Sequence, residues 1–341
     1  MSRAIISGTG LIGTSIALGL RNLGWQTLGW DADPTALAGA VGAGALVPLD
    51  GIEPATLSPD DLLVLASPPS SVLTAVSDLD TAALVIDVAS VKGPIIAAAR
   101  TPRFVGTHPM AGREVTGPDA ARAALFRGAT WVVVPNGADE KDVECVERIV
   151  TDLGARPVRM SAERHDAAVA RISHVPQILA AALLEGAGEV PGAMDLAAGS
   201  FRDLTRVASS DPGVWMDILT ANRGEVAAAI EWLRDRLAAV LESEEQLATT
   251  LEVARHLRAS LGHGLGVVRV TLEDRPGEMA AVGRALADSG VDLRDLQLRH
   301  APYGGGGILT LSVRGGHEPA LRASLEAEGF SATVPSGEEG S

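Results

Sequence analysis

The chain has 341 residues, of which 46% are hydrophobic, and a formal net charge of −15 at pH 7. This length allows two or three folded domains, and the apolar content is typical of a globular chain rather than a disordered one. The acidic balance argues against nucleic acid or an anionic membrane as a partner, because both require a basic surface. A single cysteine, Cys145, excludes an internal disulfide and a thiolate metal cluster, so no metal is expected.

The first apolar run is soon interrupted by glycines, unlike a signal peptide, and no apolar stretch is expected to be long enough to span a bilayer. We therefore expect a cytoplasmic protein. Residues 336–341 lack apolar anchors and are expected to form a solvated tail.

The most informative motif lies near the start of the chain. An apolar strand candidate at 4–6 leads directly into the sequence Gly8-Thr9-Gly10-Leu11-Ile12-Gly13. In such a strand–turn–helix, Gly8 permits the tight turn, Gly10 lets backbone N–H groups approach a pyrophosphate, and Gly13 allows the helix to pack closely on the strand. The helix N-terminus adds the positive end of its dipole. The motif therefore predicts a dinucleotide site formed by Gly8, Gly10, Leu11, Ile12 and Gly13.

The second strand candidate, 26–30, ends at Asp31, whose carboxylate can accept hydrogen bonds from both ribose hydroxyls. A 2′-phosphate would face this carboxylate as a like charge, and no arginine or lysine lies between Trp25 and Val91 to offset the repulsion. We therefore predict NAD rather than NADP as the cofactor. Ser67, which follows the strand candidate 62–66, is also assigned to the cofactor site.

Residues 1–150 alternate short β-rich runs with alanine-rich helical stretches, which predicts an α/β, Rossmann-like parallel sheet. Ligands bind at the carboxyl ends of such strands. Ser90 and Lys92 follow the strand candidate 83–88 and place a hydroxyl and an amine at this ligand-binding edge. The alternative to a role in ligand binding is that Ser90 is a helix N-cap and Lys92 is solvated. His108 follows strand 104–106 and is placed to take a proton from a substrate hydroxyl, with a structural histidine as the alternative. A further strand is expected at 130–134.

Residues 151–262 show helical periodicity, which predicts an all-α middle domain. Ser161 is the expected N-cap of a helix that carries His165 among its apolar positions. Pro176 is expected to kink this helix and direct His174 toward a cleft, although a hydrogen-bonded interhelical histidine remains the alternative. The abundance of alanine and leucine predicts close helix packing, including packing against a second subunit.

Two arginines in this region, Arg202 and Arg206, are four residues apart and would share a helix face. Such a pair could bind carboxylates bidentately, while the alternative, favoured for Arg202, is a surface ion pair with Asp203. Asp211 and Pro212 are expected to begin an apolar helix over 214–240, and a capping box at Ser243 and Gln246 to begin the next helix.

Residues 263–335 return to mixed structure, with strands expected at 267–272, 293–299, 308–313 and 331–334 and helices at 276–289 and 319–328. This βαββαβ order predicts a ferredoxin-like domain. The glycine-rich segment 303–307 is expected to be a mobile hairpin, and Asp274-Arg275-Pro276-Gly277 a turn that leaves a helix N-terminus open to a ligand.

The combination of motifs resembles the prephenate and arogenate dehydrogenases of tyrosine biosynthesis. The motifs that carry the resemblance, in the order typical of that family, are Gly8 to Gly13, Ser90-Val91-Lys92, His108-Pro109-Met110-Ala111-Gly112, Ser173-His174 and Phe201 to Ala208. The segment 274–277 looks like the opening of an ACT domain, a module that commonly binds amino acids.

The resemblance implies NAD-dependent oxidative decarboxylation of prephenate to 4-hydroxyphenylpyruvate, with oxidation of arogenate to tyrosine as the alternative. It assigns His108 as the base at the 4-hydroxyl, with Ser90 holding the hydroxyl or the imidazole in register. Arg206 would bind a substrate carboxylate, and His174 would be a polar positioning group where cofactor and substrate meet.

One position departs from the family. Gln177 stands where many prephenate-using relatives carry a histidine, near the substrate's pyruvyl or alanyl end. This difference leaves the choice between prephenate and arogenate open, and we favour prephenate. Trp215 matches a family tryptophan, although a core aromatic is its simpler interpretation.

Two competing classes are less consistent with the sequence. The β-hydroxyacid dehydrogenases place a catalytic lysine on the helical domain, but no lysine lies between Val143 and Glu273. A non-catalytic NAD-binding sensor of amino acids would leave His108 and Arg206 without a role. We expect a homodimer with a small-molecule substrate and an amino-acid effector at the ACT-like domain, with tyrosine as the hypothesis for that effector.

Overall fold

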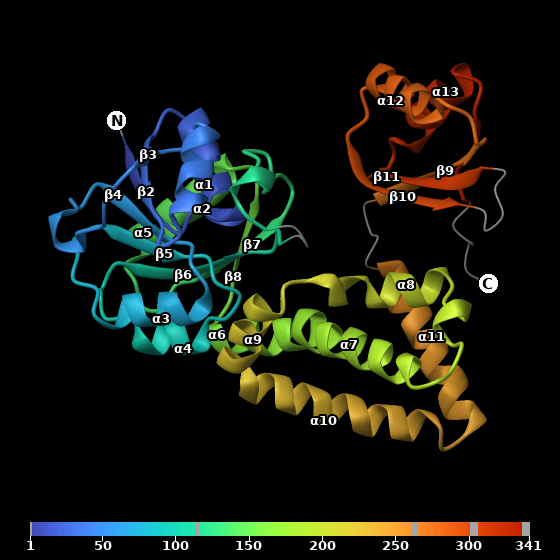
Figure 1. Cartoon of the computed structure of the whole chain (residues 1–341), viewed down its shortest axis with the longest axis horizontal. Coiled ribbons are helices and arrows are strands. Elements are labelled where there is room, and N and C mark those ends of the chain that lie inside the picture. Colours follow the sequence, from blue (N-terminus) through green and yellow to red (C-terminus); the bar gives the residue numbers. More distant parts are fainter. Residues whose placement is uncertain (1, 113–115, 261–264, 301–305, 336–341) are drawn as a thin grey trace. The chain divides into compact units, whose positions relative to one another are not determined.

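The computed structural model describes residues 2–112, 116–260, 265–300 and 306–335. The chain divides into two compact units, residues 1–234 and 235–341 (Figure 1). The expected tail at 336–341 and residues 303–305 of the expected hairpin lie outside the described residues. The predicted domain boundaries at residues 150 and 262 stay predictions.

The first unit contains a sheet of eight strands in the order β3-β2-β1-β4-β5-β6-β7-β8. The strands are β1 (Arg3–Ser7), β2 (Gln26–Trp30), β3 (Val47–Pro48), β4 (Asp61–Leu65), β5 (Leu84–Asp87), β6 (Phe104–Pro109), β7 (Thr130–Val134) and β8 (Arg156–Arg159). The predicted Rossmann-like class is confirmed. The short strands β3 and β8 were missed, because β3 has only two residues, one of them a proline, and β8 has an arginine at each end of its four residues.

One pair of neighbouring strands, β6 and β7, is antiparallel, whereas the sequence pattern predicted a parallel sheet throughout. A parallel neighbour needs a crossover that returns to the opposite edge. The segment after β6 holds a 3-10 turn, η2 (Pro118–Ala120), and returns to the edge it left, so that Pro109 pairs with Trp131. His108 therefore lies within β6, paired with Val132, rather than in a loop after the strand.

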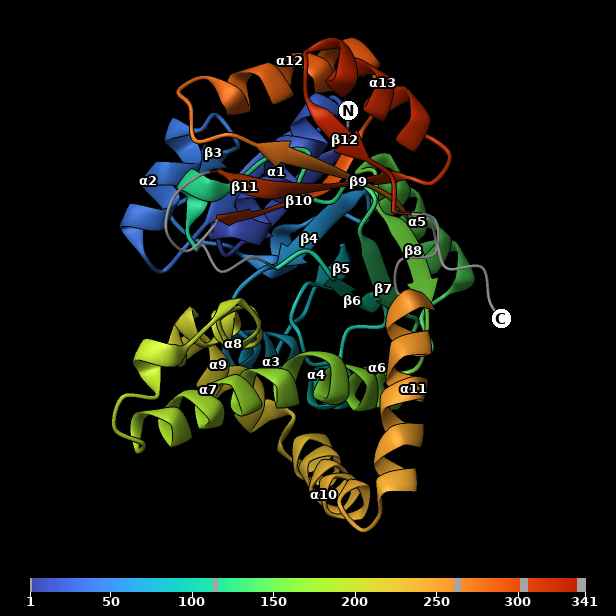
Figure 2. The same ribbon diagram turned by 90° about the vertical axis from the view of Figure 1, so that its right-hand side faces the viewer.

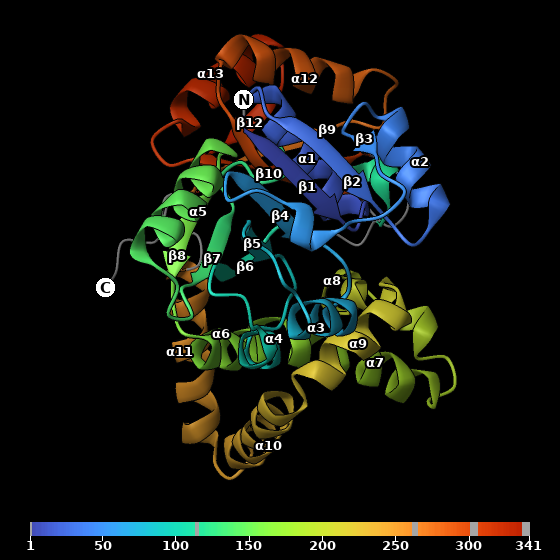
Figure 3. The same cartoon turned by 90° about the vertical axis from the view of Figure 1, so that its left-hand side faces the viewer.

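Helices cover both faces of this sheet. The buried side chains of α1 (Leu11–Asn22), α2 (Pro34–Gly42) and α5 (Glu140–Asp152) pack in one cluster on one face. Those of α3 (Pro69–Ser77) and α4 (Gly93–Ala98) pack in another, and Figure 3 shows these two helices side by side. A short 3-10 turn, η1 (Pro54–Thr56), precedes β4. With both faces covered, the carboxyl ends of the strands are left for ligands.

The middle of the chain begins with one long helix made of α6 (Ala162–Val169), a π-helical segment η3 (Ala170–His174) and α7 (Val175–Gly188). The predicted disturbance before Pro176 takes the form of this π-helical segment, because proline offers no N–H to the preceding turn. Ser161 caps the helix as predicted, accepting the backbone N–H of Arg164 at 3.3 Å.

Residues 162–188 are long and apolar enough to cross a membrane by length and composition, so the expectation that no segment would pass this test was wrong. The test is weak evidence, because core helices of folded domains also pass it. Here the helix packs through Ala170 and Val175 against Val226 and Ala229. It also carries the buried polar residues His165 and Asp166.

The remaining elements of the first unit are η4 (Met194–Leu196), α8 (Gly199–Thr205), η5 (Arg206–Ser209), α9 (Pro212–Ala221) and α10 (Arg223–Val240), whose last residues enter the second unit. Asp211 caps α9 as predicted, accepting N–H groups at 2.7 and 3.1 Å. The single helix expected over 214–240 is wrong, since it breaks at Asn222. Helix α9 packs against α3 (Figures 2 and 3), where the Asp217 carboxylate accepts both the N–H and the hydroxyl of Ser70 at 3.0 Å.

The second unit contains α11 (Glu244–Ser260), β9 (Leu265–Leu272), α12 (Glu278–Ser289), β10 (Leu293–His300), β11 (Gly307–Arg314), α13 (Glu318–Ala327) and β12 (Ser331–Thr333). Ser243 accepts the N–H of Gln246 at 3.1 Å, as the predicted capping box requires. The strands form an antiparallel sheet in the order β10-β11-β9-β12, and α12 and α13 pack on it (Figure 1). The predicted βαββαβ domain is confirmed.

Candidate active site

The glycine turn lies between β1 and α1 and is held by backbone contacts that exclude side chains. Gly8 has a φ of +97°, and a Cβ there would lie 2.6 Å from the Ala66 carbonyl. A Cβ on Gly13 would lie 2.0 Å from the Gly8 oxygen. Gly10, by contrast, has no described protein atom within 4 Å of its Cβ position, which leaves room for a phosphate beside the N-terminus of α1. Leu11 and Ile12 form the first turn of that helix.

The acidic residue of the motif is oriented toward the same turn. One oxygen of Asp31 accepts the backbone N–H of Thr9 at 2.5 Å and its hydroxyl at 3.1 Å, and the other accepts the N–H of Asp33 at 2.9 Å. Ser67 follows β4, next to β1, and its hydroxyl lies 3.5 Å from the Ser7 carbonyl oxygen. These residues fit NAD, whose ribose hydroxyls need a fixed acceptor at this place.

A chain of three polar side chains begins at His108. Its Nδ1 lies 2.9 Å from Nε2 of His165, and Nδ1 of His165 lies 2.7 Å from the Asp166 carboxylate. The two rings meet edge to face, with centroids 5.1 Å apart. Asp166 is fixed in turn by the backbone N–H groups of Lys92 at 2.8 Å and Gly93 at 2.7 Å. We call His108, His165 and Asp166 the histidine relay.

The relay determines which nitrogen of His108 can act as a base. A carboxylate only accepts hydrogen bonds, so Nδ1 of His165 carries a proton and its Nε2 is left as an acceptor. Nδ1 of His108 then donates to that acceptor, which leaves the lone pair on Nε2 of His108. Among the described residues, no hydrogen bond occupies this Nε2. His108 is half-buried, whereas His165 is 1% exposed.

The surroundings of His108 and Asp166 favour a neutral imidazole and an ionised carboxylate. Removal from water, followed by repulsion from His165, Lys92 and His174, holds the pKa of His108 well below its usual 6.5. Burial also acts to raise the pKa of Asp166. Hydrogen bonds from His165 and from the two backbone N–H groups outweigh this effect, and the pKa is lowered. The relay therefore has an uncharged base at one end and a carboxylate at the other.

His174 is buried, at 1% exposed, rather than open to a cleft. Its Nδ1 lies 3.1 Å from the amide nitrogen of Asn222, which also donates to the Asp166 carbonyl oxygen at 3.0 Å. Because an amide NH₂ only donates, Nδ1 of His174 is an acceptor and its Nε2 carries the proton. Burial lowers the pKa of His174 to about 4. The ring of Trp215 lies edge to face with it, 6.1 Å between centroids.

Lys92 and Ser90 differ from their predicted surroundings. Lys92 is 0% exposed and its ammonium contacts the Asp87 carboxylate, so the alternative of a solvated lysine is wrong. Ser90 is half-buried in the segment between β5 and α4. In the described part of the chain, no hydrogen bond joins it to His108, so its predicted contact with the imidazole is not formed here. Contact with a substrate hydroxyl stays a prediction.

The two residues assigned to the carboxylate and to the pyruvyl or alanyl end of the substrate lie on helical segments. Arg206 begins η5 directly after α8 and is exposed. Gln177 lies on α7, one turn after His174, and is 9% exposed. Its Oε1 atom makes no hydrogen bond within the described residues, which is unusual for a buried amide. Their roles stay predictions.

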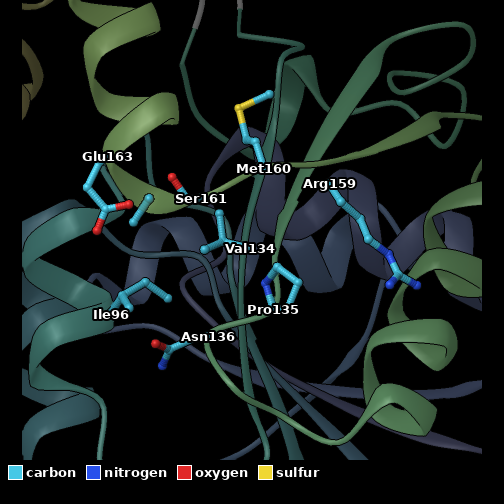
Figure 4. A pocket seen from close by; sticks show the side chains of 9 residues that line it. Ile96, Val134, Pro135, Asn136, Arg159, Met160, Ser161 and Glu163 are labelled. Carbon is cyan, nitrogen blue, oxygen red and sulfur yellow. The ribbon is translucent and has the colours of Figure 1, made fainter.

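A pocket of about 410 Å³ opens at the start of α6 (Figure 4). It is lined by Ile96, Val134, Pro135, Asn136, Arg159, Met160, Ser161, Ala162 and Glu163. None of the predicted site residues lines it. The chemistry instead points to the strand ends that carry Gly8, Ser67 and His108.

Sequence reasoning missed three residues of the site: His165, Asp166 and Asn222. His165 was assigned to the apolar face of its helix, and Asn222 was placed inside a continuous helix. The adjacent pair His165-Asp166, one turn after an N-cap, was a weak local signal, because neighbouring imidazole and carboxylate groups can satisfy each other when both are buried.

A glycine turn that fits a pyrophosphate, a carboxylate at the end of the next strand and a histidine relay at the same sheet edge are features of an NAD-dependent dehydrogenase. Residues 16–159 match the model of the prephenate dehydrogenase nucleotide-binding domain, 161–255 that of the prephenate dehydrogenase dimerization domain, and 266–326 that of the ACT domain. The chain belongs to the prephenate dehydrogenase family and is an NAD-dependent oxidoreductase.

Individual relatives agree with this assignment. The probable prephenate dehydrogenase NovF of Streptomyces niveus is 33% identical over 353 residues, covering 92% of this chain and 94% of that protein. Prephenate dehydrogenase of Bacillus subtilis is 29% identical over 365 residues, covering 96% and 97%. The crystal structure of Aquifex aeolicus prephenate dehydrogenase with hydroxyphenyl propionate and NAD+ has a TM-score of 0.69 and 30% identity, covering 76% and 98%. Synechocystis arogenate dehydrogenase has a TM-score of 0.61 and 26% identity over the same shares.

Proposed function

We propose that this chain oxidises prephenate with NAD and releases carbon dioxide and 4-hydroxyphenylpyruvate. The observation that carries the proposal is the histidine relay, which leaves Nε2 of His108 with a lone pair at the sheet edge where the cofactor motif lies. The family relationship and the named relatives support the choice of substrate.

The chemistry follows from the relay. When bound, NAD accepts a hydride from the ring carbon that bears the 4-hydroxyl. His108 takes the hydroxyl proton on Nε2, which turns the C–O bond into a ketone as the hydride leaves. The resulting imidazolium is stabilised through His165 by the Asp166 carboxylate, 2.7 Å from the second ring.

Loss of carbon dioxide then needs no further base. The electrons of the breaking carbon–carboxylate bond move through the ring to the ketone oxygen as the ring becomes aromatic. The phenolate oxygen recovers its proton from His108, so the histidine is neutral again at the end of the cycle. The lowered pKa of His108 favours this return of the proton.

Other residues would hold the substrate. Arg206 binds a substrate carboxylate as a bidentate partner and Ser90 contacts the ring hydroxyl. His174, which is buried, acts as a neutral positioning group held by Asn222 rather than by direct contact with substrate. Gln177 faces the side chain of the substrate. A neutral amide tolerates either a pyruvyl or an alanyl group, which makes arogenate the second candidate.

The test is a rate comparison. Purified protein is incubated with prephenate or arogenate, each with NAD or NADP, and the reduced cofactor is followed by absorbance at 340 nm. The proposal expects the highest kcat/KM for prephenate with NAD. A higher value for arogenate would replace the substrate, and no reduced cofactor with either would favour a non-catalytic sensor.

Assembly and regulation belong to the same proposal. We propose a homodimer formed through the helical middle region, whose exposed apolar side chains include Ile172, Met216 and Trp232. In the ACT domain, a cavity of about 360 Å³ beside Asp274, Arg275 and Gly306 could bind an amino-acid effector. Sizing by light scattering, and rates with and without millimolar tyrosine, test these two points. A cytoplasmic location stays a prediction.

A further inference from the structure

A buried ion pair lies directly beside the histidine relay and has no role in the mechanism above. The side chains of Lys92 and Asp87 are both 0% exposed and contact each other. Burying two charges is costly, and replacing such a pair with apolar residues is often neutral or stabilising. Because the Lys92–Asp87 pair is costly to bury and lies beside the proposed base His108, a functional role for it is expected.

The pair holds the peptide groups of the residue before His108. The Lys92 ammonium donates to the Thr107 carbonyl oxygen at 2.7 Å, and Asp87 accepts the Thr107 N–H at 3.1 Å. The Thr107 hydroxyl donates to the Asp87 carbonyl oxygen at 2.5 Å. The backbone pairing of β5 with β6 ends at Ile86 and Val105, so these side-chain contacts continue it to the position of the base.

Lys92 also holds the opposite end of the relay. Its backbone N–H and that of Gly93 donate to the two oxygens of Asp166, at 2.8 and 2.7 Å. One residue therefore fixes the strand that carries His108 through its side chain and the carboxylate end of the relay through its backbone.

We propose that Lys92, held by Asp87, is a positioning residue that keeps His108 aligned with His165 and with the substrate hydroxyl. The inference rests on the proposed role of His108 as the base. Lys92 is sealed from substrate by burial, so it acts through the backbone of β6 and through its charge.

The charge of the Lys92 ammonium affects the pKa of His108, which a purely structural role of Lys92 would leave unchanged. The charged or titratable groups around the His108 ring are His165 and Asp166 from α6, His174 from η3, and the Lys92–Asp87 pair. Repulsion by Lys92 is one of the causes that lower the pKa of His108. Removing the ammonium must therefore raise that pKa, whether Asp87 then stays ionised or takes up a proton.

The experiment compares Lys92→Met, which removes the charge but keeps the bulk, with the double variant Asp87→Asn/Lys92→Met, which leaves no unpaired buried charge. The matched control is Asp142→Asn/Arg103→Met, which removes the ion pair between α5 and the start of β6. Melting temperature, the KM for NAD, and pH profiles of kcat and kcat/KM with prephenate are measured for each.

We expect both Lys92 variants to lose about 10- to 100-fold in kcat, because misalignment by a fraction of an ångström to an ångström has effects of this size. The acid limb of their kcat/KM profiles should move up by roughly one pH unit. The KM for NAD should stay unchanged, and the control should keep the wild-type kcat and profile. The double variant should recover thermal stability but not the profile.

Three results would overturn the proposal. They are an unshifted acid limb in a folded variant, a kcat that recovers together with the melting temperature in the double variant, and failure of both variants to fold, which would assign the pair to folding alone. The wild-type protein separates this inference from the proposed function. If wild type does not reduce NAD with prephenate, the function fails. If it does and the variants match it, only the positioning role fails.

Discussion

Replacing Asp166 with asparagine tests the histidine relay most informatively. Asp166 accepts three hydrogen bonds, from Nδ1 of His165 and from the backbone N–H groups of Lys92 and Gly93. The amide of Asp166→Asn can place its oxygen toward only one side. In one orientation its NH₂ faces the N–H of Gly93. In the other it faces Lys92 and His165, which reverses the tautomer of His165 and moves the proton of His108 to Nε2.

Both orientations have measurable costs. Each loses one backbone hydrogen bond to a charged acceptor, worth about 1.5–3 kcal/mol. This corresponds to a fall in Tm of roughly 3–12 °C for a domain of this size. The carboxylate that stabilises the imidazolium is absent in both orientations, and the base is blocked in one. We therefore expect kcat to fall by about 10²- to 10⁴-fold, the range for general base catalysis and for loss of the correct tautomer.

The assay is steady-state reduction of NAD by prephenate, with Tm measured on the same samples. Asp142→Asn is the matched control, because Asp142 is also a buried carboxylate that accepts two hydrogen bonds, here from Arg103, but lies outside the relay. The control should lose stability and keep its kcat. A kcat of Asp166→Asn within about twofold of wild type would refute the tautomer argument.

Three further predictions follow from single residues. Because His108 must be neutral to accept a proton and its pKa is held well below 6.5, the acid limb of kcat/KM for wild type should fall below pH 6.5, and a limb at pH 7 or above would exclude this assignment. Arg206→Ala should raise the KM for prephenate at least tenfold with a smaller change in the KM for NAD, and an unchanged KM for prephenate would return Arg206 to a structural role. Asp31→Asn, which removes the like charge near a 2′-phosphate, should raise kcat/KM with NADP relative to NAD by about tenfold, and an unaltered ratio would contradict the basis of cofactor choice.

Elements with strong local signals were predictable from the sequence. The glycine turn, the N-caps at Ser161 and Asp211, and the alternation of strands and helices in the ACT domain each depend on residues close together in the chain. The order of strands in the sheet and the antiparallel β7 depend instead on how a long connection returns, which periodicity does not encode.

The site was only partly predictable for a related reason. His108 was recognised because it follows an apolar strand, but its partner His165 is 57 positions away and lies at an apolar position of a helix. A solvated Lys92 was left open as an alternative, because the spacing of Asp87 and Lys92 alone does not indicate that both side chains are buried and paired. Asn222 separates α9 from α10 without a proline, and its side chain bonds to His174 and to the Asp166 carbonyl oxygen, two contacts that are distant in sequence. Such contacts are set by tertiary packing.

The central claim is that His108 is the base for oxidation of the substrate hydroxyl. The direct measurement is the turnover of His108→Asn with prephenate and NAD, together with NAD affinity measured by fluorescence titration. The account predicts a loss of about 10²- to 10⁴-fold in kcat with NAD affinity nearly intact. Turnover equal to wild type would contradict it.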